Sequence, residues 1–294
     1  MPLTRLLRYR SEGEDVLRVK RRLLELGCYA AHIMQLQTNV FGADTLRAVK
    51  AFQEKSGLEA DGIVGPLTYA ALFPEEAPAV TQAQRADIPA QIGDDAASAI
   101  LSALEGAGQT RRAIVLDALC FACDADAPGE YPQSLYIRGG NLYNTDLSPN
   151  VITLARIRSG AKRQPEYYDG GRQEMMERAV QQNPQITGAD CSGGVVGLLR
   201  HAGVVKSTFD LSADGFAGSK SMRKIESDAL NPADLLHKSG HIGLYAGGGY
   251  AVEWMGGAYG CQLTRVANRR GWNFVKRRTD SFGAWTQYLR PNWY

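Results

Sequence analysis

Apolar residues recur every three or four positions in the first seventy residues, and this spacing predicts helices. The first helix is expected over 12–27, where Gly27 is placed to end it. Its apolar face consists of Val16, Val19, Leu23 and Leu26. The run FGADTLRAVKAFQEKSGL predicts a second helix, and DGIVGPLTYAALF predicts a turn at Asp61–Gly62 followed by a short third helix. These elements predict a small three-helix domain over 1–74.

The pattern changes after this region. Residues 75–95 are rich in Pro, Ala, Gln and acids without an apolar period, which is typical of a linker. Beyond it, GADCSGGVVGLLRHAGVV predicts a helix that stops at Gly203, and HIGLYAGGGYAVEW predicts a β-hairpin. The polar stretch 141–189 contains a further expected helix at 172–182. We therefore expect an α+β domain over 96–294.

Charge and composition exclude several classes of protein. The chain has 294 residues and a net charge of +2, so no strong field indicates a nucleic-acid partner. A basic cluster in 265–278 is interpreted as a solvated face, with a site for anionic polymers as the alternative. No run of about 20 apolar residues predicts a membrane span. The first residues lack the apolar core of a secretory signal, so none is expected.

Five cysteines are an odd number, and a disulfide framework is not expected. Cys120 and Cys123 form a C-x-x-C, which would suit a redox or zinc site. The surrounding AIVLDALCFAC is apolar, however, and no second ligand pair completes four zinc ligands. We expect two core cysteines here and no metal.

The strongest candidate for chemistry is Cys191. Asp190 can cap the helix that Cys191 begins, so the thiol would face the positive end of the helix dipole and unpaired amides. Both effects favour the thiolate, and the amides can bind an oxyanion. Gly193 and Gly194 are poor helix formers, which indicates a close approach to the backbone. The alternative is a packed cysteine on a glycine-rich helix start.

A thiolate needs a base that can later protonate the leaving amine, and His241 is the best-placed histidine. In the predicted hairpin, Glu253 can lie on the same face of the sheet and accept a hydrogen bond from the imidazole. The other histidines, His32, His201 and His237, are expected to be structural.

Two resemblances extend this interpretation. The run FGADTLRAVKAFQEKSGLEADGIVGPLTYAAL resembles the peptidoglycan-binding domain family in its three-helix form, which implies attachment to cell-wall glycan or peptide. A generic helical module for protein contacts is the alternative. The words DCSGGVVGLLRHAG and ADLLHKSGHIGLYAGGG, followed by YAVEW, resemble the NlpC-type cell-wall cysteine peptidases, which have a papain-like fold.

The second resemblance implies roles for particular residues. Cys191 would be the nucleophile and His241 the base and acid, whereas Glu253 stands where many members have a third His. SLYIRGGNLY resembles the family's Y-x-W-G-G stretch, so Tyr136 would lie beside the nucleophile. Ile137–Arg138 replace the usual apolar–aromatic pair there. Asp190 and Ser192 match positions that hold the free amine and carboxylate of the stem peptide, although Asp190 is equally explained as a helix cap.

The resemblances together imply a peptidoglycan hydrolase that acts on the bacterial wall and cleaves stem peptides at the γ-D-glutamyl–diamino acid bond. No metal or organic cofactor is implied. The alternatives are another cysteine-dependent amidase or acyl transferase, and a catalytically silent wall-binding protein. Without a signal peptide, such an enzyme would be released by lysis, carried by a phage as an endolysin, or exported by a non-Sec route.

Overall fold

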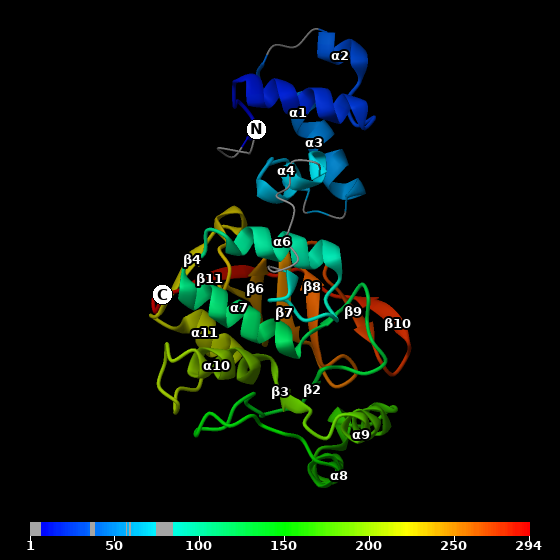
Figure 1. Ribbon diagram of the computed structural model, residues 1–294, viewed down its shortest axis with the longest axis vertical. Coiled ribbons are helices and arrows are strands. Elements are labelled where there is room, and N and C mark those ends of the chain that lie inside the picture. The colour runs from blue at the N-terminus through cyan, green and yellow to red at the C-terminus, as the bar shows by residue number, and fades with distance from the viewer. Residues whose placement is uncertain (1–6, 36–38, 57, 59, 75–84) are drawn as a thin grey trace. The chain divides into compact units, whose positions relative to one another are not determined.

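Two units make up the chain, Met1–Val80 and Thr81–Tyr294. The computed structural model describes residues 7–35, 39–56, 58, 60–74 and 85–294 (Figure 1). Ten residues of the expected linker, 75–84, lie outside the described part. No helix within the described ranges is long and apolar enough to cross a membrane.

The first unit is helical. Its elements are α1 (Glu14–Glu25), α2 (Ala31–Gln35), α3 (Ala43–Lys55) and α4 (Pro66–Leu72). The three predicted helices are present, and Gly27 adopts a left-handed φ of 71° just after α1. The single turn of α2 was not predicted, because five residues carry too little apolar periodicity. The core includes Val16, Val19, Leu23, Phe41, Val49, Phe52, Val64 and Leu72.

The side chain of Gln53 holds the turn at Asp61–Gly62, which lies in the run that resembles the peptidoglycan-binding domain family. Its side chain is buried on α3, where its Nε2 donates to the carbonyl oxygen of Ile63 (2.9 Å) and its Oε1 accepts from the amide of Gly62 (2.8 Å). Gly62 has a φ of +80°, and a β-carbon there would lie 2.3 Å from a methyl of Leu46. The motif residues therefore hold a tight turn against α3.

The second unit is built on a seven-stranded sheet in the order β1-β8-β7-β6-β5-β11-β4. All pairs in it are antiparallel except β1 with β8. The strands are β1 (Cys123–Asp124), β4 (Met222–Ile225), β5 (Leu235–Lys238), β6 (His241–Gly247), β7 (Tyr250–Trp254), β8 (Cys261–Arg265) and β11 (Gln287–Pro291). The expected hairpin is the β6–β7 pair, so the α+β class is confirmed for this unit.

Helices pack on this sheet (Figure 1). They are α6 (Asp94–Leu104), α7 (Gln109–Phe121), α10 (Cys191–His201) and α11 (Ala213–Gly218), and α10 packs against β6 and β7. The expected linker 75–95 is wrong at its C-terminal end. Ile88 and Ile92 are buried, and α6 already begins at Asp94. Two isoleucines four residues apart were too sparse a signal among the Ala, Gln and Pro residues.

The polar stretch 141–189 forms a subdomain at one end of the sheet. It contains α8 (Leu154–Arg163), the 3₁₀ turn η2 (Pro165–Tyr167), α9 (Arg172–Gln182) and β3 (Thr187–Ala189), which pairs in parallel with β2 (Ser134–Tyr136). The helix predicted at 172–182 is confirmed as α9, whereas α8 was not predicted. The remaining strands, β9 (Arg270–Asn273) and β10 (Arg278–Ser281), form a separate hairpin.

Candidate active site

Cys191 is the first residue of α10 and is only 7% exposed. Its thiol lies 3.8 Å from the carbonyl oxygen of Gly240 and within hydrogen-bond reach of the amide of Ile242. Those two residues flank His241 in the chain, so the sulfur sits beside the backbone of the expected base. The amides of Cys191 and Ser192 also reach the sulfur.

The helix position of Cys191 does not by itself produce a thiolate. Burial raises the pKa of Cys191 to about 11, and the charge of Asp190 adds to this rise. The amides of Ile242, Ser192 and Cys191 lower it, but burial outweighs them. The first-turn amides therefore act in the expected direction, but burial outweighs them, and a base is required to take the thiol proton.

His241 begins β6, and its Nε2 lies 2.7 Å from Oε2 of Glu253 on β7. In the strand register Glu253 is opposite Gly243, so His241 is its diagonal neighbour on the same face. The imidazole also stacks on Trp285, with ring centroids 5.5 Å apart. Because Nε2 bonds the carboxylate, Nδ1 is the ring nitrogen left for a proton transfer.

Glu253 is completely buried and ionised. Its Oε1 accepts from Thr264 (2.6 Å) and from Nε of Arg269 (2.8 Å), and its Oε2 accepts from a terminal nitrogen of Arg269 as well as from His241. Burial alone would raise the pKa of Glu253, but the hydrogen bonds and charges of Arg269 and His241 lower it to about 2. The acceptor for His241 is therefore a carboxylate whose charge is compensated.

Sequence reasoning missed Arg269. It was placed in a solvated basic cluster, but it is 4% exposed and its guanidinium stacks 4.4 Å from the ring centre of Trp285. Nothing in the local sequence separates it from the exposed Arg270 next to it. Only the fold of the β8–β9 region carries it to Glu253.

The glycines after Cys191 are required by neighbouring protein groups. A β-carbon on Gly193 would lie 1.9 Å from the carbonyl oxygen of Gly140, and one on Gly194 would lie 2.1 Å from the ring of Trp254. The predicted close approach to this backbone is confirmed, and the approaching groups are a loop and an indole of the same unit.

Asp190 and Ser192 are bonded to each other and to the helix start. Oδ1 of Asp190 accepts from the amide of Gly193 (2.7 Å) and from the hydroxyl of Ser192 (3.0 Å), and Oδ2 accepts from the amide of Gly139 (2.8 Å). Asp190 is thus an N-cap of α10.

Tyr136, at the end of β2, is half-buried, and burial and then the nearby Cys191 raise its pKa. In the β2–β3 register Tyr136 lies opposite Ala189, two residues before Cys191.

The turn that touches the thiol is held from α11. Oδ1 of Asp214 accepts from the amide of Gly240 (2.9 Å) and lies 2.9 Å from Nε2 of His237. His237 is thus paired at the turn, and His201 pairs with Asp117 at 2.7 Å.

Cys123 is buried as expected, whereas Cys120 on α7 is exposed, so its assignment to the core is wrong. Among the described residues no group of three or more His, Cys, Asp and Glu could hold a metal.

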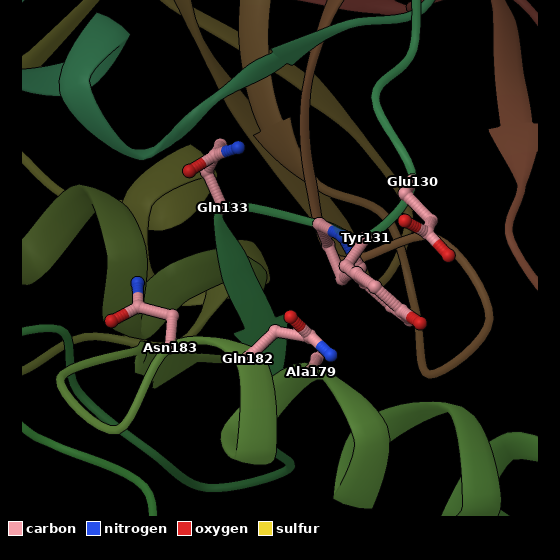
Figure 2. Close-up of a pocket in the computed structure, with 7 residues that line it drawn as sticks. Glu130, Tyr131, Gln133, Ala179, Gln182 and Asn183 are labelled. Atoms are coloured by element: carbon pink, nitrogen blue, oxygen red, sulfur yellow. The ribbon is translucent and has the colours of Figure 1, made fainter.

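A hollow of about 190 Å³ lies away from these residues. It is lined by the segment before β2, including Tyr131 and Gln133, and by Gln182 and Asn183 at the end of α9 (Figure 2). Cys191, His241 and Glu253 do not line it.

The first unit matches a known family. Residues 12–72 match the model described as "Putative peptidoglycan binding domain", so the first unit carries a domain of this family. No curated protein matches the chain. One matching solved structure is the "Crystal structure of Burkholderia AP3 phage endolysin", with 20% identity and a TM-score of 0.21. The match covers 62% of this chain and 54% of that chain, so this chain spans about half of that structure.

Proposed function

We propose that the chain is a peptidoglycan hydrolase that uses its first unit to attach to the cell wall and its second unit as a cysteine peptidase. The attachment is supported by the family match of residues 12–72. One observation carries the peptidase proposal: the Cys191 thiol touches the backbone on both sides of His241, whose Nε2 is bonded to the buried Glu253 carboxylate. In this proposal Cys191 is the nucleophile, His241 is the base, and Glu253 is the group that orients the base.

In the proposed reaction, Nδ1 of His241 takes the thiol proton as the Cys191 sulfur attacks a peptide carbonyl. Amides at the start of α10, with Tyr136 beside them, stabilise the oxyanion. Collapse breaks the C–N bond, the imidazolium protonates the leaving amine, and a thioester remains. A water then gives a proton to His241 and attacks the thioester, which releases a carboxylic acid and restores the thiol.

Glu253 makes this proton transfer possible at neutral pH. Its carboxylate binds Nε2, which leaves Nδ1 to take the thiol proton, and it stabilises the imidazolium. Arg269 keeps that carboxylate ionised in a fully buried place. Arg269 is therefore a positioning residue that acts through Glu253.

The proposed scissile bond joins the γ-carboxyl of D-glutamate to the diamino acid of the stem peptide, as the NlpC-type resemblance implies. Asp190 and Ser192 border the thiol and are the proposed contacts for the stem. No metal or organic cofactor takes part in this proposal. The enzyme would act at the bacterial wall.

Mass spectrometry of digested peptidoglycan tests the proposal. Wild type and Cys120→Ala, which removes an exposed thiol away from the site, are expected to release peptides that begin with the diamino acid. Cys191→Ala is expected to release none. Release of whole stems that begin with L-alanine would instead indicate an amidase. Unchanged muropeptides across several wall types, with the thiols reduced, would leave wall binding without catalysis.

A further inference from the structure

The loop that carries Arg138 is fixed to the start of the nucleophile helix. The amide of Ile137 donates to the carbonyl of Ala189 (2.9 Å), and the amide of Asp190 donates to the carbonyl of Gly140 (2.9 Å). The amide of Gly139 donates to the Asp190 carboxylate. Three hydrogen bonds on both sides of Arg138 thus tie its backbone to the residues just before Cys191.

The side chain of Arg138 is exposed and its charge is uncompensated. Its guanidinium lies over the ring of Tyr167, 4.6 Å from the centroid, and it forms no hydrogen bond or ion pair with any residue in the described ranges. Arg156 and Arg172, on the same subdomain, are instead bonded to neighbouring oxygens. This contact with Tyr167 holds the guanidinium through its face and leaves its N–H groups for another partner.

The guanidinium of Arg138 lies near the Cys191 thiol. Burial and Cys191 raise the pKa of Tyr136, and the charge of Arg138 acts on the same hydroxyl in the opposite direction. The Tyr136 hydroxyl is therefore close enough for both Cys191 and Arg138 to affect its pKa. Ser192, the residue that the resemblance assigns to carboxylate binding, donates its hydroxyl to Asp190 instead. Arg138 is then the available group for an anion beside the nucleophile.

We propose that Arg138 binds a substrate carboxylate next to the scissile carbonyl and selects stem peptides that carry it. The inference rests on the proposed function. In a γ-D-glutamyl bond, the residue whose carbonyl is attacked keeps its α-carboxylate free, a short aliphatic spacer away. A planar guanidinium pairs with such a carboxylate through two N–H groups, whereas an α-carboxamide offers neither the charge nor two acceptors. Stems with the free carboxylate would be cleaved in preference to amidated stems.

The test uses the full chain and two synthetic stem peptides that differ only in the α-carboxylate or α-carboxamide of D-glutamate. For wild type we expect kcat/KM to be about tenfold to hundredfold higher with the carboxylate peptide. Arg138→Gln is expected to bring the two values together by lowering the value for the carboxylate peptide. Arg138→Lys should retain part of the preference. Arg223→Gln, which removes an exposed arginine on the edge strand β4, should keep the full preference.

Equal cleavage of both peptides by wild type, or a preference that survives Arg138→Gln, would overturn the role of Arg138 while leaving the peptidase proposal intact. Cleavage of neither peptide would contradict the proposed scissile bond. Calorimetric binding of the two peptides to Cys191→Ala, and to the same variant with Arg138→Gln, would then decide on Arg138 by the same comparison. A carboxylate preference lost with Arg138 supports the proposal, and equal binding refutes it.

Discussion

Removal of the Arg269 guanidinium tests whether Glu253 depends on it. Arg269→Met would leave a carboxylate that is completely buried beside His241 without its principal cation. Arg269 and His241 together, against the effect of burial, lower the pKa of Glu253 from 4.5 to about 2, and at about 1.4 kcal/mol per pKa unit this net shift corresponds to about 3–4 kcal/mol. Loss of one partner of a buried ion pair costs about 3–5 kcal/mol, which agrees with that magnitude.

The pH dependence provides a second signature. Because the pKa of Glu253 is lowered in the folded state, its contribution to stability is complete above about pH 4.5 and is lost as the pH falls toward 2. In Arg269→Met, protonation of Glu253 would relieve the uncompensated charge at low pH. The difference in unfolding free energy between wild type and variant should therefore shrink by about 1 kcal/mol or more between pH 7 and pH 3.5.

Urea unfolding followed by tryptophan fluorescence is the suitable assay, because all four tryptophans lie in the second unit. Arg270→Met is the matched control. It removes an exposed arginine from the adjacent position and should change stability by at most about 0.5 kcal/mol. A loss for Arg269→Met no larger than that of the control, or a loss equal at both pH values, would refute the reasoning. The kcat of Arg269→Met on stem peptides should fall as well.

Three further outcomes are expected. In His241→Ala, the Cys191 thiol should react with iodoacetamide more slowly than in wild type at pH 7. Its rate should rise about tenfold per pH unit toward the thiol pKa of about 11. Gly193→Ala should abolish most peptidase activity and destabilise the second unit, because the new β-carbon would meet the Gly140 carbonyl at 1.9 Å. Gln53→Ala should lose about 2–3 kcal/mol from the first unit and weaken sedimentation with peptidoglycan, while soluble stem peptides are cleaved normally.

Each of these outcomes has a control. Cys120 should be replaced by Ala in both alkylation samples, since it is exposed and would react in its own right. Equal rates at pH 7 would remove His241 from the role of base. Gly218→Ala is the control for Gly193, because a β-carbon there has no atom within 4 Å. For Gln53→Ala, circular dichroism measures the folding of the first unit and sedimentation measures wall binding. Unchanged stability together with unimpaired wall binding would contradict a structural role for that turn.

Much of the site could be predicted, because its parts follow local rules. A cap residue before a cysteine specifies a thiol at a helix start, and Asp190 does accept from Gly193. Alternation along two strands joined by a short turn places His241 and Glu253 on one face, and their 2.7 Å contact follows. The sequence also predicts the helix at 172–182, which the structure contains as α9.

Other features could not be predicted, because they depend on what long-range packing brings together. The composition of residues 85–95 predicts a linker, because the burial of Ile88 and Ile92 depends on packing within the second unit. The role of Gly193 and Gly194 was anticipated only as a close approach, since the partners, Gly140 and Trp254, lie about fifty and sixty residues away in the chain.

Helix periodicity and strand alternation are local properties of the chain. They are enough to predict the element types of the two units, the three main helices of the first unit, and the pairing of His241 with Glu253. The burial of Cys191, which makes a base necessary, and the compensation of Glu253 by Arg269 instead of by solvent both depend on tertiary packing. Burial and charge compensation are sums over neighbours from distant segments, and the order of residues along the chain does not contain those neighbours until the sheet has formed.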